Sequence, residues 1–218
     1  CKKESARKAS GADHNIKIEG RGRAILDGGN YNGLSERNCK EEGRPHISVN
    51  NLILFANVDG FRVSGLQVKN QRWWALNFIY CRNGLLSNLD FLSDYTRIDG
   101  QGNRVEGLRN NDYASAYIKN SDGIDLRCGC HDIIIENITG FTEDDTIALT
   151  GLRGKVEKIY EVADADPDIH NITIRNVCSR AGRVLNLAGS ITNLTLDNIR
   201  GFDREGLGDE IENNAEVY

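Results

Sequence analysis

The chain has 218 residues, of which 39% are hydrophobic and 27% are charged, and these proportions are typical of a folded globular protein. The length is sufficient for one hydrophobic core and predicts a single domain over residues 1–218. The formal net charge of −5 argues against a surface that binds nucleic acid or anionic membranes. No apolar run approaches the roughly 18 residues that a transmembrane helix needs, so we expect no membrane span.

The N-terminal residue is Cys1, and Lys2 and Lys3 follow it. The sequence contains no methionine, not even an initiator, so we expect either that it is not the full translation product or that modified methionines were left out. No signal peptide is visible, and a processed or truncated chain would have lost it. Cys1 fits the lipidated first residue of a processed bacterial lipoprotein, and it fits a truncation point equally well. The sequence therefore leaves the localisation open between secreted, periplasmic, lipid-anchored and cytoplasmic.

Short strand-like phrases recur along the chain, and most of them run from a polar turn through alternating Ile, Leu or Val to Asn or Gly. They are HNIKIEG (14–20), DGFRVSGLQVKN (59–70), RNGLLSNLDF (82–91), HDIIIENITG (131–140), HNITIRNV (170–177) and TNLTLDNIRG (192–201). Alternation with a period of two in such short runs predicts β-strands rather than helices. With Gly60, Gly84, Asp132, Asn171 and Asn193 taken as equivalent, the steps are 24, 48, 39 and 22 residues.

These steps indicate a repeat of about 22–24 residues, lengthened in places by insertions. A repeat of that length with short strands predicts an all-β fold, a parallel β-helix whose coils stack around alternating apolar residues. Asn suits the bends, because it tolerates left-handed backbone and can hydrogen-bond along the stack.

Two polar segments, near residues 93–119 and 152–167, interrupt the repeat. We expect them to leave the stack as loops, either as walls of a cleft or as solvated decoration.

The six cysteines, at positions 1, 39, 81, 128, 130 and 178, form no compact framework. Cys128-Gly-Cys130-His131 suggests a metal site, but zinc sites usually space paired cysteines by two or more residues and need four ligands. We therefore expect free thiols in or beside the core, no metal and no cofactor.

Two phrases place acidic residues directly before an alternating Ile-x-Leu pair. They are NSDGIDL (120–126) and EDDTIALTG (143–151). Aligning their apolar pairs gives a step of 23 residues, which is one coil, and places Asp122 under Asp145. Neighbouring strands lie about 4.8 Å apart, so these carboxyl groups should be close, with Asp144 displaced to one side. Like charges at such a distance are destabilising unless the protein uses them.

Three clustered carboxyl groups match the needs of an inverting glycosidase. One carboxylic acid protonates the leaving oxygen, while carboxylate activates a water on the opposite face of the sugar. Mutual repulsion would raise a pKa within the cluster and keep one member protonated. The residues alone leave two alternatives open, a solvated turn and a set of calcium ligands, since hard cations prefer clustered carboxylates.

At these residues the chain resembles the polygalacturonase family, glycoside hydrolase family 28. NSDGID is similar to the family's Asn-Thr-Asp motif and EDDTIALTG to its Asp-Asp motif, in the same order and one coil apart. IKIEGRGRAILDGGNYNG (16–33) resembles the family's early coil, and the likeness covers roughly residues 14–200. The resemblance implies a right-handed, single-stranded parallel β-helix and metal-independent, inverting hydrolysis of pectic galacturonides. It also implies that Asp144 is the general acid and that Asp122 and Asp145 hold and activate the water.

Two motifs of that family have no clear counterpart in the sequence. The coil expected to carry Gly-His-Gly reads CSRAGRVLNLAGS, without histidine, and no convincing Arg-x-Lys follows. Register places Arg183 over Asp145, where it could grip a uronate group or serve as a neutralising structural partner. Trp73 and Trp74 lie one coil below Asp122. At least one should face outward as a surface for sugar stacking, and burial in the core is the expectation for one of the two.

The sequence thus predicts a polygalacturonase-like glycoside hydrolase acting on pectic or other uronic-acid-containing carbohydrate, with Arg183, Trp73 and Trp74 as substrate-binding residues. The expected partner is a carbohydrate and not nucleic acid. One alternative is a non-catalytic, carbohydrate-binding β-helix, which the missing histidine favours. Another is a polysaccharide lyase, which usually needs calcium and a Lys or Arg base. The sequence does not determine which sugar is bound, whether cleavage is exo or endo, or what the oligomeric state is.

Overall fold

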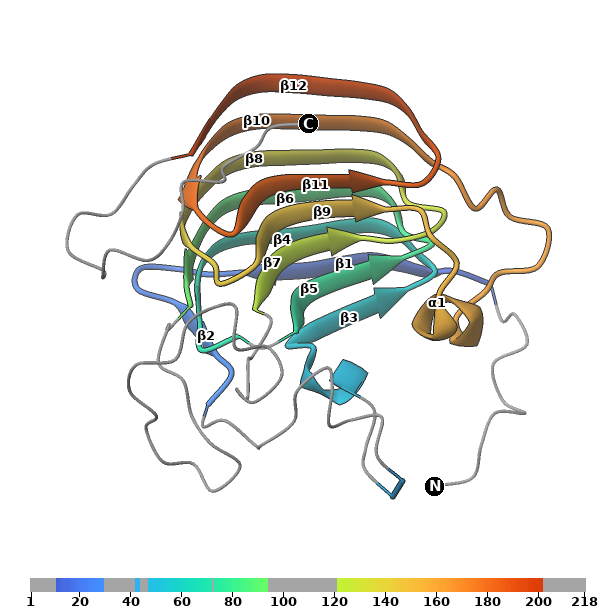
Figure 1. The fold of residues 1–218 in the computed structure, drawn as a ribbon, viewed down its shortest axis with the longest axis horizontal. Helices are drawn as coiled ribbons and strands as arrows, with labels where there is room; N and C mark the ends of the chain where they lie inside the picture. The colour runs from blue at the N-terminus through green and yellow to red at the C-terminus, as the bar shows by residue number, and fades with distance from the viewer. Residues whose placement is uncertain (1–10, 30–41, 44–46, 72, 94–120, 202–218) are drawn as a thin grey trace.

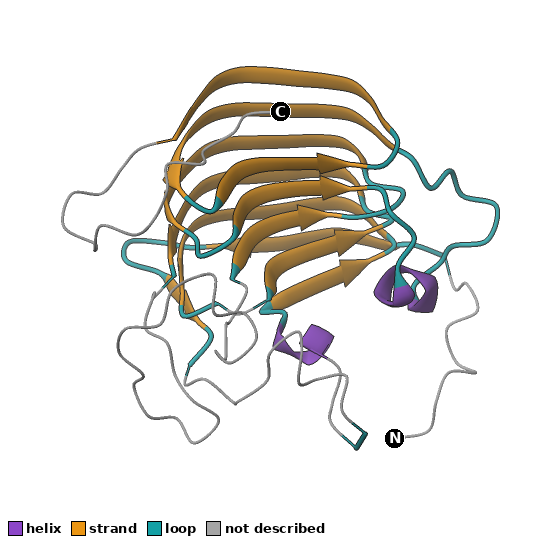
Figure 2. Cartoon of the chain, viewed as in Figure 1, coloured by secondary structure: helices purple, strands orange, loops and turns teal. Residues whose placement is uncertain are grey.

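The computed structural model describes residues 11–29, 42–43, 47–71, 73–93 and 121–201. Parallel strands in two stacked sheets make up nearly all of the regular structure in these ranges (Figures 1 and 2). The long sheet contains β1 (Asp13–Glu19), β2 (Ile25–Asp27), β4 (Val58–Lys69), β6 (Arg82–Leu92), β8 (His131–Phe141), β10 (Ile169–Arg180) and β12 (Ile191–Gly201). The short sheet contains β3 (Ile53–Ala56), β5 (Trp74–Ile79), β7 (Asp122–Leu126), β9 (Asp145–Thr150) and β11 (Arg183–Ala188). The described helices are the 3₁₀ helix η2 (Ile47–Asn50) and α1 (Lys155–Ile159).

The chain winds between the two sheets as a coil. The long sheet has the order β1-β4-β6-β8-β10-β12 with β2 also paired to β4, and the short sheet has the order β3-β5-β7-β9-β11. From β3 to β12 consecutive strands alternate between the sheets, and each pairs in parallel with its equivalent one turn away (Figure 1). The fold is therefore the right-handed parallel β-helix that the sequence predicted.

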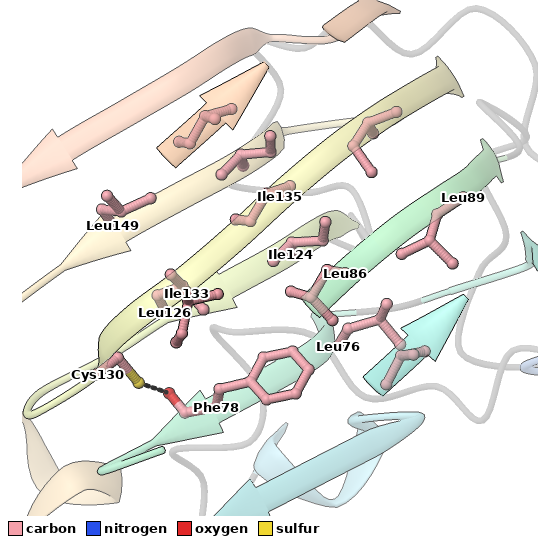
Figure 3. Packing of buried hydrophobic residues seen from close by; sticks show 14 of the residues in the cluster. Leu76, Phe78, Leu86, Leu89, Ile124, Leu126, Cys130, Ile133, Ile135 and Leu149 are labelled. Atoms are coloured by element: carbon pink, nitrogen blue, oxygen red, sulfur yellow. Dashed lines mark hydrogen bonds between the residues drawn. The ribbon is translucent and has the colours of Figure 1, made fainter. Parts of the chain in front are cut away.

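Alternating apolar side chains from both sheets fill the inside of the coil (Figure 3). Leu76, Ile124 and Ile147 occupy one register position on three successive short strands, and none is exposed to solvent. Leu86 and Ile135 form an equivalent buried pair in the long sheet. Burial of one such side chain stabilises the fold by about 1.5–3 kcal/mol, so these rows hold adjacent coils in register.

Residues with left-handed backbone mark two bends of the long sheet. One row consists of Asn15, Gly60, Asn83, Asp132, Asn171 and Asn193, and the other of Gly65, Asn88, Asn137, Asn176 and Asn198. Gly, Asn and Asp adopt this conformation at the lowest cost. In the second row Nδ2 of Asn137 donates to Oδ1 of Asn88 at 3.1 Å, and Nδ2 of Asn176 donates to Oδ1 of Asn137 at 3.2 Å. The bends therefore also link neighbouring coils, as the sequence predicted.

The pairing of β4 with β6 corrects one equivalence drawn from the sequence. Gly84 pairs with Phe61, so Gly60 lies opposite Asn83. The offsets between successive coils are 23, 49, 39 and 22 residues. The shared feature at this position is the left-handed backbone, which Asn83 adopts. Gly84 serves another purpose, because a Cβ there would lie 2.2 Å from the Phe61 ring.

The polar segment near residues 152–167 leaves the stack and contains α1 (Figure 1). Val156 and Glu157 of this helix are buried, and Val156 packs against Ile79 and Tyr80. The segment therefore covers the end of β5 and is not merely solvated decoration. The other expected insertion lies outside the described residues from residue 94 onward. In the part of the chain that the structure covers, no helix is long and apolar enough to cross a membrane.

The four described cysteines are free thiols, as predicted. Cys81, Cys128 and Cys130 are buried, and Cys178 is exposed. The thiol of Cys130 donates to the main-chain oxygen of Phe78 at 3.2 Å (Figure 3). Burial raises the pKa of Cys81 to about 12, so this thiol stays protonated and behaves as a core residue. The first two cysteines of the sequence lie outside the described residues.

Candidate active site

The two acidic phrases stand on neighbouring coils in the predicted register. Ile124 of β7 pairs with Ile147 of β9. At the start of these strands the main-chain N–H of Asp145 donates to Oδ1 of Asp122 at 3.2 Å. One carboxyl oxygen from each of Asp122, Asp144 and Asp145 lies within 4.8 Å of the others. The structure therefore brings the three predicted carboxyl groups into one cluster.

Arg183 lies on the next coil and neutralises part of this cluster. It pairs in register with Asp145, as predicted. Its Nε donates to Oδ1 of Asp145 at 2.6 Å, and its Nη2 donates to Oδ1 of Asp144 at 3.2 Å. Nδ2 of Asn186, which the sequence did not reveal, donates to Oδ2 of Asp145 at 2.7 Å. The side chain of Arg183 is 44% exposed, so one edge of the guanidinium also faces solvent.

Trp73 and Trp74 lie one coil below the carboxyl cluster and form an aromatic wall. Trp74 pairs in register with Asp122. The two indole rings stack with centroids 4.6 Å apart and an interplanar angle of 27°. Trp73 has a φ of 55°, a conformation that bulky residues rarely adopt, and its carbonyl accepts the N–H of Asp122 at 3.0 Å. This bend fixes the wall beside the carboxyl cluster.

The carboxyl cluster, Arg183 and the aromatic wall face one cleft of about 340 Å³. Its lining consists of Trp73, Trp74, Asp122, Asp125, Arg127, Asp144, Asp145, Ala148, Thr150, Arg183 and Asn186. All six residues that the sequence predicted for the site line this cleft. Trp73 is buried, with 7% of its surface exposed, whereas Trp74 is partly exposed. A larger hollow of about 530 Å³ lies between β1, β3 and the segment after α1, but it contains none of them. The smaller cleft is therefore the candidate site, because it contains the six predicted residues.

Burial is the largest cause of the raised pKa values of the three carboxyl groups. It raises the pKa of Asp122 well above the ordinary value, and the charges of Asp125, Asp144 and Asp145 raise it further. Burial also raises the pKa of Asp144, against the opposing charge of Arg183. The pKa of Asp145 rises to about 6, because burial and the Asp144 charge outweigh its hydrogen bonds. The cluster can therefore hold a proton near neutral pH, which a general acid requires.

Asp125 and Arg127 are cleft residues that the sequence interpretation missed. They occupy alternate positions on and just beyond β7, between and after the inward-facing Ile124 and Leu126. Asp125 is fully buried, its carboxyl oxygens have no hydrogen-bond partner among the described residues, and Nη1 of Arg127 lies 3.6 Å from Oδ1. The signal was available in the sequence, because two charged residues at outward positions of a strand beside Asp122 predict a shared face.

Comparisons with known proteins show the family of the chain and agree with its β-helix fold. The family model described as glycosyl hydrolases family 28 matches residues 5–193. The chain belongs to glycosyl hydrolase family 28. The crystal structure of a hyperthermoactive exopolygalacturonase from Thermotoga maritima is similar in fold, with a TM-score of 0.58 and 17% sequence identity. The alignment covers 86% of this chain and 44% of that chain. No curated protein matches the sequence.

The aspartates of this family 28 protein also offer oxygen ligands that a cation could use. Hard cations such as Ca²⁺ take about six to eight oxygen ligands. Here Arg183 already occupies oxygens of Asp144 and Asp145, and a main-chain N–H occupies Oδ1 of Asp122. The carboxyl oxygens of this cluster therefore fit proton transfer better than they fit the coordination of calcium.

Proposed function

We propose that this family 28 protein hydrolyses glycosidic bonds in a pectic or other uronic-acid-containing carbohydrate, with inversion at the anomeric carbon. The observation that carries the proposal is the gathering of Asp122, Asp144 and Asp145 in one cleft beside an aromatic wall. Membership of a glycosyl hydrolase family supports the reaction class. We further propose that residues 1–218 fold as one domain, which one cooperative unfolding transition would support.

Asp144 is the general acid of the proposed reaction. Its side chain is 26% exposed, whereas that of Asp145 is 4% exposed, so Asp144 is better placed to reach a ligand. Burial raises its pKa, and this favours the protonated form that a general acid needs. After the proton has moved to the leaving oxygen, the nearby Arg183 stabilises the carboxylate that remains.

Asp122 and Asp145 hold and activate the attacking water. Arg183 and Asn186 fix the orientation of the Asp145 carboxyl group, and the N–H of Asp145 fixes Asp122. The water oxygen bonds to the anomeric carbon while the bond to the leaving oxygen breaks. The proton of Asp144 passes to the leaving oxygen, and one water proton passes to the Asp122 and Asp145 pair, so charge and atoms balance.

The aromatic wall and Arg183 bind the substrate. Trp73 and Arg127 cover the faces of the Trp74 indole, so a sugar ring can contact its partly exposed edge. The exposed edge of the Arg183 guanidinium can bind a uronate carboxylate. Arg183 stands in the coil where the sequence resemblance leads one to expect histidine. The protein therefore combines the three carboxyl groups with a different basic partner.

The test is a reducing-sugar assay on a panel of pectic fragments, with and without a chelator. Hydrolysis that is insensitive to chelator is expected, and Asp144→Asn should lower kcat by about 10²–10⁴-fold without loss of folding. Full activity of D144N would remove Asp144 as the acid. Calcium-dependent release of unsaturated products would instead indicate a lyase.

The stereochemistry needs its own measurement. The carboxyl oxygens lie within 4.8 Å, which is shorter than the usual separation in inverting enzymes of about 6.5–9.5 Å between carboxyl groups. Inversion is proposed because the family motifs imply it. Proton NMR of the first product formed should show the anomer opposite to that of the bond cleaved, and the same anomer would indicate retention.

A second candidate function is carbohydrate binding without turnover. The observation that favours it is Arg183, which pairs with Asp144 and Asp145 where the resemblance leads one to expect histidine. Measurable binding of pectic fragments by a wild-type protein that hydrolyses none of them would support this alternative.

A further inference from the structure

Helix α1 is connected to the cleft through two buried charged side chains. Glu157 lies on α1 and Arg127 lies just after β7, and their exposed fractions are 3% and 9%. Oε1 of Glu157 accepts a hydrogen bond from Nε of Arg127 at 2.7 Å and lies 2.6 Å from Nη2. A buried, charge-assisted contact to two nitrogens of one guanidinium fixes its orientation as well as its position.

The guanidinium of Arg127 lies over the aromatic wall. Its Cζ is 3.9 Å from the centroid of the Trp74 ring, which is the geometry of a cation–π interaction. Trp74 in turn stacks on Trp73 at 4.6 Å. An unbroken series of contacts therefore leads from Glu157 through Arg127 and Trp74 to Trp73.

Arg127 also has a second acidic neighbour. Nη1 lies 3.6 Å from Oδ1 of Asp125, a fully buried residue whose carboxyl oxygens have no hydrogen-bond partner among the described residues. Glu157 and Asp125 thus lie within reach of the same guanidinium, and Glu157 holds it more closely. Without the Glu157 charge, Arg127 would turn toward Asp125 and away from its position over Trp74.

We propose that Glu157 is a positioning residue of the cleft, which holds Arg127 flat against Trp74 and thereby fixes the aromatic wall. The segment near residues 152–167 then sets the affinity for a sugar that contacts the edge of this wall. Only this last step rests on the proposed function, because the link between Glu157 and the tryptophans exists whether or not a sugar binds.

The chain itself supplies a specific probe, because Trp73 and Trp74 are the two tryptophans of the sequence. Tryptophan fluorescence and the circular dichroism couplet of stacked indoles therefore report on the wall alone. Glu157→Gln should weaken the couplet and change the emission maximum while the amide I infrared band stays that of a β protein. The matched control is Glu161→Gln in the same segment, whose carboxylate makes an exposed ion pair with Arg153 at 3.7 Å. This control should leave both tryptophan signals unchanged.

Glu157→Gln leaves a buried guanidinium beside a neutral group, so it could prevent folding. Glu157→Asp keeps the charge but is one methylene shorter, and it should weaken the couplet partly. A folded E157Q or E157D protein with wild-type tryptophan signals would overturn the proposal, and so would an E161Q protein with the altered signals of E157Q.

The activity measurement tests the second step. On a pectic fragment that the wild type hydrolyses, E157Q should raise KM by about threefold to tenfold with little change in kcat. An unchanged KM together with altered tryptophan signals would refute the effect on affinity. If the wild type hydrolyses no fragment, the proposed function fails, and the spectroscopic comparison still decides the role of Glu157.

Discussion

Replacement of Arg183 by Gln should move the whole pH profile of kcat/KM to higher pH. The charge and hydrogen bonds of Arg183 oppose the rise of the pKa of both Asp144 and Asp145. Without the guanidinium, both carboxyl groups release their protons at higher pH. The limb set by the acid and the limb set by the base therefore both shift upward.

The size of the shift follows from distance and exposure. Two unit charges about 4 Å apart interact by about 4 kcal/mol at the effective dielectric constant near a protein surface. The side chain of Arg183 is 44% exposed, so screening by solvent reduces the interaction toward about 1 kcal/mol. At about 1.36 kcal/mol per unit of pKa, the profile should move by about one pH unit.

The assay is the initial rate on one pectic fragment, measured across pH in buffers of equal ionic strength. Arg175→Gln is a matched control, because Arg175 makes an exposed ion pair with Glu136 on the long sheet, away from the cleft residues. The control should leave the profile in place. An R183Q profile that stays in place or moves to lower pH would refute the electrostatic role of Arg183.

Three further outcomes are expected. Asp122→Asn should raise the melting temperature at pH 8 but not at pH 4. Folding raises the pKa of Asp122, so this carboxyl group stabilises the protein only while it is protonated. That stabilisation is lost as the pH rises through the raised pKa. A gain at pH 4 equal to that at pH 8 would contradict this. Asn137→Ala should lower the free energy of unfolding by about 1–3 kcal/mol, because it forces Ala into left-handed backbone and removes two hydrogen bonds. Unfolding in denaturant would measure this loss. Trp74→Ala should raise KM by about tenfold with little change in kcat, since it removes the aromatic edge that contacts the sugar and the ring that holds Arg127. Steady-state kinetics would measure both constants.

The fold could be predicted from the sequence because the β-helix repeats one simple pattern. Alternating apolar residues gave the strands, and equal spacing of the two Ile-x-Leu pairs gave the register that puts Asp122 beside Asp145. The one misplaced coil arose because glycine serves two purposes. Gly60 makes a bend through its left-handed backbone, whereas Gly84 leaves room for the Phe61 ring. The sequence alone does not distinguish these two roles of glycine.

The predicted part of the site follows the repeat, whereas Asp125 and Asn186 were missed although they lie on strands of the repeat, and Glu157 was missed because it lies outside it. Asp144, Asp145 and Arg183 lie at positions that register fixes. Glu157 belongs to a segment outside the repeat, and its pairing with Arg127 depends on how that segment folds back onto the stack. Period-two alternation carries no information about such a contact, so only the three-dimensional structure reveals it.

The two rows of asparagine and glycine at the bends make the coil modular. Successive turns differ in length by as much as 27 residues, from 22 to 49, yet the same bend position recurs in each. Because each turn is anchored at the bends, the connecting segments can change without disturbing the strands that carry the aspartates. A segment such as that near residues 152–167 should therefore be exchangeable between β-helices, provided that the replacement keeps an acidic side chain at the position of Glu157 for the buried Arg127.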